Sequence, residues 1–165
     1  MPEFHINIEP IGYVVNTVEE PVDSGWGEVE SRLVLREDLA PALTGLEEFS
    51  HVLVVYWMHR AVPPEVLRRR PQGREDMPEV GLFVQRSKHR PNPIGVTVVT
   101  LVSVRDGELV VRGLDAINGT PVLDIKPHYP EYDSPSGAHV PEWVGRLMKG
   151  YFEGEPEEGI DVDRE

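Results

Sequence analysis

The stretch Val96-Thr-Val-Val-Thr-Leu-Val-Ser-Val-Arg-Asp-Gly-Glu-Leu-Val-Val-Arg-Gly-Leu114 decides the fold class. Both of its halves are rich in β-branched residues, which favour strands. Asp106-Gly107 separates the halves, and an Asp-Gly pair is a strong hairpin signal because both residues tolerate positive φ. The stretch therefore predicts two antiparallel strands joined by a tight turn.

Outward from this hairpin, alternating apolar and polar residues, interrupted by Gly, Pro and Asp, predict mainly strands. Helix signals are limited to a short turn at 37–43 and a segment at 141–149, where Pro141 suits the start of a helix. This pattern indicates an all-β protein, either a small closed barrel or a sandwich, with long loops and little helix. The expected strands lie near residues 6–15, 29–36, 49–58, 80–87, 94–105, 108–115 and 121–128.

The length of 165 residues fits one domain that needs no disulfide or metal to fold. We expect this domain over residues 1–152, followed by an acidic, disordered tail over 153–165. The longest apolar run, Val52–Met58, is too short to cross a membrane, and the N-terminus has no leader pattern. We therefore expect a cytoplasmic protein that does not enter a membrane.

The net charge of −13 is unevenly distributed along the chain. Residues 1–31 carry seven acidic and no basic side chains, and residues 153–165 carry seven acidic side chains and Arg164. Between them, residues 59–90 hold eight Lys or Arg against four acidic residues. A basic centre between acidic ends permits local binding of a polyanion or an anionic cofactor group. Alternatively, these charges only keep the surface soluble.

Missing residues exclude several common kinds of active site. The absence of cysteine excludes disulfide scaffolds, thiolate zinc sites and cysteine nucleophiles. The six histidines show neither His-x-x-x-His nor His-Glu-x-x-His spacing, so we expect no metal site. The chain also lacks a dinucleotide-binding glycine fingerprint, a Walker phosphate loop and a Gly-x-Ser-x-Gly elbow.

The densest functional pattern is Gly81-Leu-Phe-Val-Gln-Arg-Ser-Lys-His-Arg-Pro-Asn-Pro-Ile-Gly95. In an extended strand, Arg86, Lys88 and Arg90 share one face, where three cations are tolerable only in water or opposite an anion. Two prolines then fix the backbone around Asn92, whose amide offers one acceptor and two donors to a base edge. The alternative is an exposed strand end closed by a proline turn.

A second pattern runs over residues 115–128. Asp124 and Lys126 share one face of the expected strand. Asp115 and Asn118 lie at its loop edge, where they could hold ribose hydroxyls or an ammonium group. An ordinary half-exposed strand gives the same pattern.

Two further candidates stand alone. His59 and Arg60 follow an apolar strand, where they could meet a ligand, although a partly exposed histidine at a strand end is common. Trp26 lies in a Gly-rich loop, where its ring could stack on a base or cover the core.

Four ordered motifs carry a resemblance to a known family, over about residues 8–133. They are Ile11-Gly12, Gly45-Leu-Glu-Glu-Phe-Ser-His51, the stretch Gly81 to Gly95 with Arg86-Ser87 and Arg90-Pro-Asn-Pro-Ile-Gly95, and Gly119-Thr-Pro-Val-Leu-Asp-Ile-Lys-Pro127. The chain resembles the YaeB-like or TsaA-like family of S-adenosylmethionine-dependent tRNA methyltransferases. Members of this family methylate the exocyclic amine of the threonylcarbamoyl-modified adenosine next to the anticodon.

The resemblance implies an all-β barrel that binds S-adenosylmethionine, acts on the tRNA anticodon loop and forms a homodimer. The chain departs from the family pattern in several places. Its first loop lacks a Pro-Arg-Gln sequence, Leu82 and Val84 replace smaller residues, and Asn118 replaces an Asp before Gly-Thr-Pro. Matched positions imply cofactor contacts at Gly25, Trp26, Gly27, His59, Arg60, Arg86 or Arg90, Leu101, Asp115, Ala116, Ile117 and Asn118.

Methyl transfer from a sulfonium to an amine is an in-line displacement in which positioning supplies much of the rate. We expect Asn92, Asp124 and Lys126 to form the catalytic, acceptor side of the site. We expect Arg86 and Arg90 to hold the carboxylate of the cofactor or an RNA phosphate. Two alternatives remain open: methylation of a small metabolite, and a noncatalytic S-adenosylmethionine-binding module.

Overall fold

The computed structural model describes residues 5–153, so the expected tail lies outside the described residues apart from Glu153. The predicted hairpin is confirmed: β6 (Ile94–Arg105) and β7 (Glu108–Arg112) pair antiparallel, and Arg105 faces Glu108 across a two-residue turn. Asp106 and Gly107 take φ values of 51° and 79° in this turn. Positive φ at both residues matches the right-handed twist of the flanking strands.

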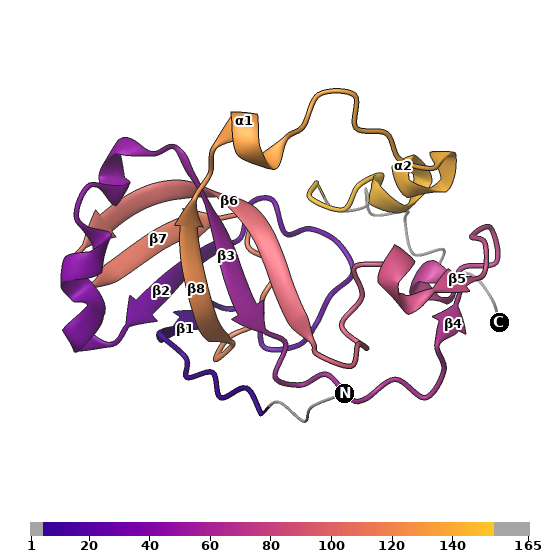
Figure 1. Ribbon diagram of the computed structural model, residues 1–165, viewed down its shortest axis with the longest axis horizontal. Helices are drawn as coiled ribbons and strands as arrows, with labels where there is room; N and C mark the ends of the chain where they lie inside the picture. Colours follow the sequence, from indigo (N-terminus) through magenta and orange to yellow (C-terminus); the bar gives the residue numbers. More distant parts are fainter. Residues whose placement is uncertain (1–4, 154–165) are drawn as a thin grey trace, which may run out of the picture.

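Six strands form a closed antiparallel barrel in the order β1-β2-β7-β6-β3-β8 (Figure 1). The barrel closes where β1 pairs with β8, at Gly12 opposite Val122 and Tyr13 opposite Pro121. The all-β barrel expected from the sequence is therefore confirmed. The other barrel strands are β1 (Gly12–Val15), β2 (Glu30–Leu35), β3 (His51–Trp57) and β8 (Pro121–Pro127).

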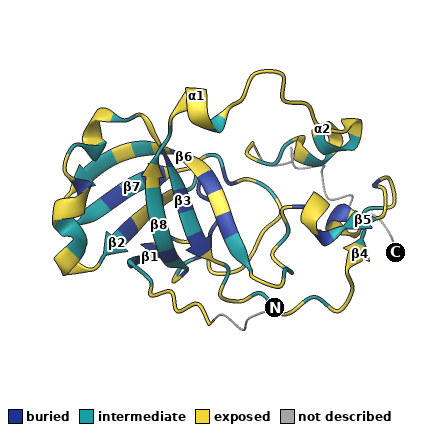
Figure 2. Ribbon diagram, in the orientation of Figure 1, coloured by how far each residue is buried: buried dark blue, intermediate teal, exposed yellow. Residues whose placement is uncertain are grey.

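Alternate residues of each strand fill the barrel interior, and Figure 2 shows this alternation along β6. Fully burying a Val or Leu side chain stabilises the fold by about 1.5–3 kcal/mol relative to leaving it exposed. The fully buried core side chains include Val14, Leu33, Val52, Val54, Leu109, Val111, Leu114 and Val122.

Helices are short, as the sequence predicts. The predicted turn at 37–43 is the 3-10 helix η1 (Glu37–Leu43), which is followed by η2 (Leu46–Glu48). The predicted segment at 141–149 contains α2 (Glu142–Met148), and one further turn, α1 (Pro130–Asp133), follows β8. None of the described helices has the length and hydropathy that a membrane-spanning helix needs.

The connection between β3 and β6, residues 58–93, forms a lobe beside the barrel that we call the excursion (Figure 1). Its only strand pairing among the described residues joins two residues on each side, β4 (Arg68–Arg69) with β5 (Val80–Gly81). The excursion also contains two short 3-10 helices, η3 (Pro71–Gly73) and η4 (Leu82–Val84).

The predicted strand at 80–87 is wrong beyond Gly81, because η4 turns the chain. The amide N–H of Gln85 donates to the Leu82 carbonyl at 3.2 Å, and the buried Gln85 side chain donates to the Arg69 carbonyl at 2.9 Å. The three cations that follow therefore do not share one strand face. The predicted first strand is also shorter than expected, since β1 begins at Gly12.

At one end of the barrel β1, β3 and β7 end and β2, β6 and β8 begin. Antiparallel pairing brings the three connections made at this end together. These connections are residues 16–29, the excursion, and residues 113–120. All but one of the cofactor contacts implied by the sequence lie on these three connections.

Candidate functional site

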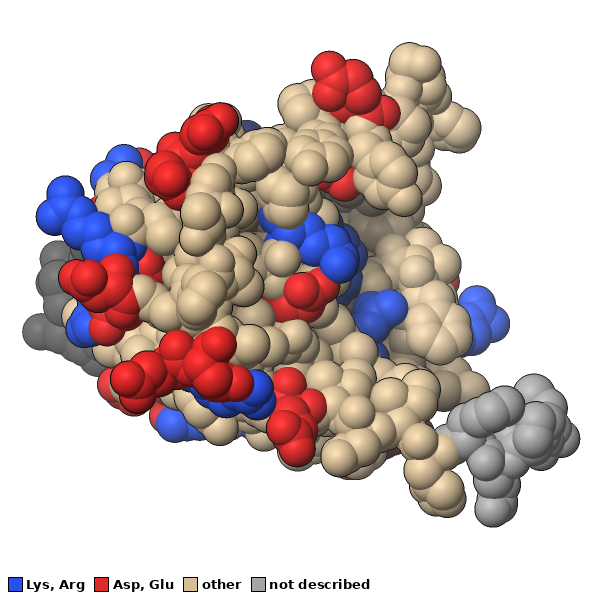
Figure 3. Space-filling view, turned by 60° about the vertical axis from the view of Figure 1, so that its left-hand side comes forward, with Lys and Arg blue, Asp and Glu red and all other residues tan. Residues whose placement is uncertain are grey.

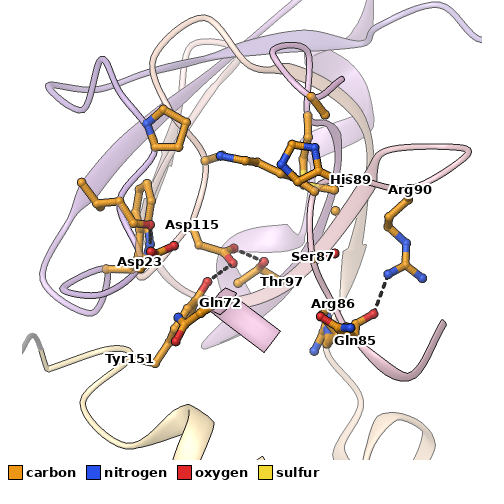
Figure 4. A pocket seen from close by; sticks show the side chains of 18 of the residues that line it. Asp23, Gln72, Gln85, Arg86, Ser87, His89, Arg90, Thr97, Asp115 and Tyr151 are labelled. Atoms are coloured by element: carbon orange, nitrogen blue, oxygen red, sulfur yellow. Dashed lines mark hydrogen bonds between the residues drawn. The ribbon is translucent and has the colours of Figure 1, made fainter. Parts of the chain in front are cut away.

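A cavity of about 1000 Å³ lies at this end of the barrel, between the three connections and the segment that follows α2 (Figure 4). Its position follows from the pairing of β6. Over Ile94–Val99 this strand pairs with β3, and its pairing with β7 begins only at Thr100. One edge of β6 is therefore open where the cavity lies, and the Val96 carbonyl on that edge accepts a hydrogen bond from Arg86.

The Asp115 carboxylate is held by three hydroxyl groups. Its Oδ1 accepts hydrogen bonds from the hydroxyls of Tyr56, at 2.8 Å, and Thr97. Its Oδ2 accepts one from Tyr151, at 2.7 Å (Figure 4). Two of these donors come from barrel strands and one from the C-terminal segment. Three charge-assisted bonds fix the carboxylate in place and stabilise its negative charge.

Both tyrosines bonded to Asp115 are held in the neutral form. Burial raises the pKa of Tyr56 far above its ordinary value, and the negative charge of Asp115 adds to the rise. The same two causes, in the same order, raise the pKa of Tyr151. A neutral phenol keeps its proton, so each tyrosine remains a donor to the carboxylate.

Gly95 makes room for this arrangement. It lies opposite Tyr56 in the β3–β6 pair, and a Cβ atom at position 95 would lie 2.3 Å from the Tyr56 ring. Only glycine lets the ring pack against the backbone and reach Asp115. The glycine that ends the Pro-Asn-Pro-Ile-Gly motif therefore serves the site through Tyr56.

Basic side chains predominate around the cavity, although the chain as a whole is acidic. Six Arg or Lys residues line it against two carboxylates, Asp23 and Asp115. Figure 3 shows basic side chains bordering a hollow in the molecular surface. The local charge therefore favours an anionic group or a polyanion at this opening. The six cations are Arg60, Arg69, Arg70, Arg86, Lys88 and Arg90.

The two predicted arginines of the long motif are bonded differently. Arg86 is exposed, and it donates to the Val96 carbonyl at the open edge of β6. Arg90 instead supports the turn before it: its Nη1 donates to the Gln85 carbonyl at 2.5 Å, and its guanidinium lies 5.8 Å from the Phe83 ring centroid. Arg86 is thus the better placed of the two to meet a ligand.

Three predicted residues line the cavity from the loops that follow β1 and β3. Trp26 is buried, and its indole N–H donates to the Val22 carbonyl at 3.2 Å. Arg60 pairs with Glu20 at 2.7 Å, which ties the two loops together. Burial lowers the pKa of His59, and the adjacent Arg60 cation lowers it further. His59 is therefore more readily neutral than an ordinary histidine.

Ala116 and Ile117 also line the cavity, whereas four other predicted cofactor contacts do not. Leu101 packs against the barrel core, opposite the buried Val111. The Asn118 side chain is bonded to the loop after β1, where it donates to Glu19 Oε1 at 3.0 Å. Gly25 and Gly27 instead donate backbone hydrogen bonds to the C-terminal segment.

The predicted acceptor-side group is not assembled at the cavity. Asn92 is exposed between two lining residues, Arg90 and Ile94. Asp124 and Lys126 form an ion pair at 2.6 Å on the outer surface of β8. They point outward because they face Val55 and Leu53, which lie on the outer face of β3.

Sequence reasoning missed several lining residues. Tyr56 and Thr97 alternate with apolar strand residues and were indistinguishable from core positions. Val96, directly after Gly95, lines the cavity in place of the expected Leu101. Tyr151 and Phe152 follow α2, and no local signal links them to Asp115. Among the described residues no cluster of three or more His, Asp or Glu could hold a metal ion.

Comparisons with known proteins find relatives named as S-adenosylmethionine-binding proteins and as tRNA methyltransferases. Residues 15–134 match the family model described as the tRNA-methyltransferase O N-terminal domain. A probable S-adenosyl-L-methionine-binding protein of Methanothermobacter thermautotrophicus is 39% identical over 139 residues, which cover 81% of this chain and 98% of that protein. The human tRNA (adenine(37)-N6)-methyltransferase is 36% identical over 142 residues, covering 81% of this chain and 32% of the human protein.

A solved structure of TrmO from Pseudomonas aeruginosa superposes with a TM-score of 0.71 at 30% sequence identity. The match covers 86% of this chain and 63% of the solved chain, so this chain spans less than two thirds of that relative. The family model begins at the last residue of β1 and covers the barrel from β2 to β8, together with the excursion and the Asp115 loop. The chain therefore belongs to the tRNA-methyltransferase O N-terminal domain family.

Proposed function

We propose that this chain is an S-adenosylmethionine-dependent tRNA methyltransferase. Its substrate in this proposal is the exocyclic amine of threonylcarbamoyl-adenosine in the anticodon loop. One observation carries the proposal: the long Gly81–Gly95 motif and the Asp115 loop converge on one cavity in which a fixed carboxylate lies among basic side chains. The family membership and the names of the relatives support the same activity.

The residues present fit S-adenosylmethionine. The cavity volume of about 1000 Å³ is at the upper end of the range for small-molecule sites. The buried Oγ of Ser87 has no hydrogen-bond partner among the described residues, so it is available to a ligand. Apolar side chains, including those of Met58, Ile117 and Met148, complete the lining.

In this proposal Asp115 accepts hydrogen bonds from ribose hydroxyls or from the ammonium group of the cofactor. A carboxylate has about four acceptor positions, and three hydroxyls occupy three of them here. Arg86 pairs with the cofactor carboxylate. When bound, S-adenosylmethionine supplies an electrophilic methyl group on its sulfonium.

The tRNA contacts are proposed on the open side of the cavity. Lys88 is exposed and has no ion pair within residues 5–153, and Arg69 also lines the opening. Such cations bind phosphates without reading sequence. Asn92, which is exposed and lies between the lining residues Arg90 and Ile94 in the sequence, remains our proposal for a contact to the acceptor base. Asp124 and Lys126 remain proposals only for a surface that reaches β8.

The decisive experiment is transfer of a labelled methyl group from S-adenosylmethionine to tRNA that carries or lacks the threonylcarbamoyl group. We expect labelled tRNA only when the modified adenosine is present, and no labelling by the Asp115→Asn variant. The Tyr132→Phe variant, which changes an exposed tyrosine on α1, is the matched control. Cofactor binding without labelling of any tRNA would instead support a noncatalytic binding module. Labelling of a small metabolite in a cell extract would support the other alternative.

We also propose that the chain forms a homodimer and works in the cytoplasm, on tRNA. The excursion exposes a group of apolar side chains with no cover within the described chain, and exposed apolar groups of this kind mark interaction surfaces. Light scattering should give a dimer mass, and the Leu67→Ser variant should shift it toward the monomer. These side chains are Val62, Val66, Leu67, Phe83 and Val84.

A further inference from the structure

The last part of the described chain closes one side of the cavity. We call residues 141–153, which contain α2, Tyr151 and Phe152, the C-terminal strap. The strap lies outside the residues that the family model matches, which end at residue 134. Figure 1 shows α2 lying beside the excursion, away from the barrel strands.

The strap is attached to both walls of the cavity. The amide of Gly25 donates to the Tyr151 carbonyl at 2.9 Å, and the amide of Gly27 donates to the Phe152 carbonyl at 2.7 Å. On the other wall, Arg146 donates to the Asp76 carbonyl in the excursion at 3.4 Å. The strap therefore joins the loop after β1 to the excursion.

The strap packs directly against residue 27, and only glycine leaves room for it there. A Cβ atom there would lie 2.5 Å from the Phe152 carbonyl oxygen. Real Cβ atoms do not approach other atoms this closely. The neighbouring atom belongs to the backbone, so it cannot move aside by a change of rotamer as a side-chain atom can. Gly27 was expected to contact the cofactor, but it does not line the cavity, and it contacts the strap at Phe152 instead.

The strap also contributes to the chemistry of the cavity. The Tyr151 hydroxyl donates to Asp115 Oδ2 at 2.7 Å. Apolar side chains of the same segment, Leu147, Met148 and Phe152, line the cavity. The cavity holds about 1000 Å³ with the strap in place, which is ample for a small-molecule ligand. A ligand therefore need not displace the strap.

We propose that the C-terminal strap is a fixed wall of the cofactor site and that Tyr151 is a positioning residue for Asp115. This inference rests on the proposed function, because it assumes that the cavity binds S-adenosylmethionine. Tyr56 and Thr97 hold one carboxylate oxygen, and Tyr151 holds the other. Because both carboxylate oxygens of Asp115 are held, its one remaining acceptor position points toward the ligand in a fixed direction.

The test is calorimetric titration of S-adenosylmethionine into the full chain and its variants. We expect Tyr151→Phe, which keeps the ring and removes the hydroxyl, to weaken binding about tenfold. Tyr132→Phe, on the exposed α1, should bind as the wild type does. In turnover assays the KM for S-adenosylmethionine should rise about tenfold in Tyr151→Phe, while kcat stays within about twofold.

A second variant separates this role from a loss of folding. Gly27→Ala should detach the strap from the loop after β1. The amide of Gly25 would then lose its hydrogen bond to Tyr151, and hydrogen exchange should show that this amide is no longer protected. Thermal unfolding should show that the barrel remains folded. In the Gly27→Ala background, Tyr151→Phe should cost little further affinity, because the hydroxyl has already left Asp115.

The outcomes separate the two proposals. No binding to the wild-type chain would overturn the proposed function and this inference with it. Wild-type binding that Tyr151→Phe leaves unchanged would overturn the inference alone. Tighter binding by either variant would identify the strap as a plug that competes with the ligand, and would overturn its role as a wall.

Discussion

Gly95 lies directly opposite Tyr56 in the barrel, and a Cβ atom at position 95 would lie 2.3 Å from the Tyr56 ring. This pair links two roles of the same strands. The ring fills the end of the core, and its hydroxyl holds the carboxylate of Asp115 at 2.8 Å. Packing of the barrel and geometry of the cavity therefore depend on the same contact.

Replacing Gly95 by Ala should damage both. Overpacking should lower the free energy of unfolding by about 1–3 kcal/mol, and the displaced Tyr56 should release Asp115. We expect urea unfolding to show the first effect and titration with S-adenosylmethionine to show a loss of affinity greater than stability explains. Thr100→Ala, an exposed site further along β6, is the control and should change stability by no more than about 0.5 kcal/mol. Unchanged affinity in Gly95→Ala would contradict the link.

Stability should fall at alkaline pH because of Tyr56. Its folded-state pKa is raised by burial and by Asp115, while the unfolded residue titrates near 10. Below about pH 10 both states hold the proton and the stability from this contact is complete. Above it the unfolded state loses the proton first, so stability from Tyr56 should fall by about 1.4 kcal/mol per pH unit.

Urea unfolding measured from pH 8 to pH 11 tests this dependence. The raised pKa of Tyr151 has the same sign, although its effect is smaller because solvent reaches that ring. Tyr56→Phe should flatten the slope, whereas Tyr132→Phe should leave it as it is, since Tyr132 is exposed. An equal slope in Tyr56→Phe and the wild type would show that other groups cause the loss.

Arg86 and Arg90 should separate into a binding role and a structural role. Arg90→Ala removes donors to the Gln85 and Leu82 carbonyls, so it should loosen the excursion. Limited proteolysis should then cut within residues 60–93 faster than in the wild type. Arg86→Ala should leave cleavage unchanged and weaken cofactor binding. Cofactor binding lost in Arg90→Ala with normal resistance to protease would give Arg90 a direct contact instead.

Asn118→Asp should be unfavourable in this chain, although the related family pattern has Asp at this position. Asn118 donates to Glu19 Oε1 at 3.0 Å, and a second carboxylate there would repel Glu19. We expect a loss of about 0.5–1 kcal/mol in unfolding free energy, as for other exposed pairs. Adding Glu19→Gln should recover most of the loss. A double variant as unstable as the single one would show that repulsion is not the cause.

Lys88 should contribute to tRNA affinity through phosphate contact alone. Lys88→Ala should weaken tRNA binding and reduce the slope of log affinity against log salt by about one. Arg105→Ala, at the β6–β7 turn on the opposite end of the barrel, should change neither value. Binding curves at several salt concentrations make the measurement. A change in affinity with the slope preserved would rule out a phosphate contact.

Much of the barrel could be predicted from sequence because its signals are local. The Asp106-Gly107 turn sets the β6–β7 hairpin, and apolar alternation marks β2, β3 and β8. Closure could not be predicted from these local patterns, because it depends on β1 pairing with β8 and a sandwich has the same local pattern. The prediction of a barrel came from the family resemblance. The strand predicted at 80–87 failed because an apolar run such as Leu82-Phe83-Val84 suits a tight turn as well as a strand.

The site was only partly predictable for a similar reason. Asp115 could be identified because the turn signal after it places its carboxylate where a strand passes into a loop, a position that a ligand can reach. Tyr151, by contrast, meets Asp115 only through tertiary structure, and the pattern around it indicates nothing beyond a helix end. Leu101 was matched to the wrong part of β6, and only the open edge at Val96 identifies the segment that faces the cavity.

The pairing that closes the barrel also bears on how the protein folds. β1 and β8 are joined at only two registered positions, Gly12 with Val122 and Tyr13 with Pro121. These partners are far apart in sequence, so their contact carries a large loop-closure entropy and should form late. The loops before β8 and after β1 come together only at that step. The cavity is thus among the last features to form during folding, and a newly made chain has its hairpins before it can bind a ligand.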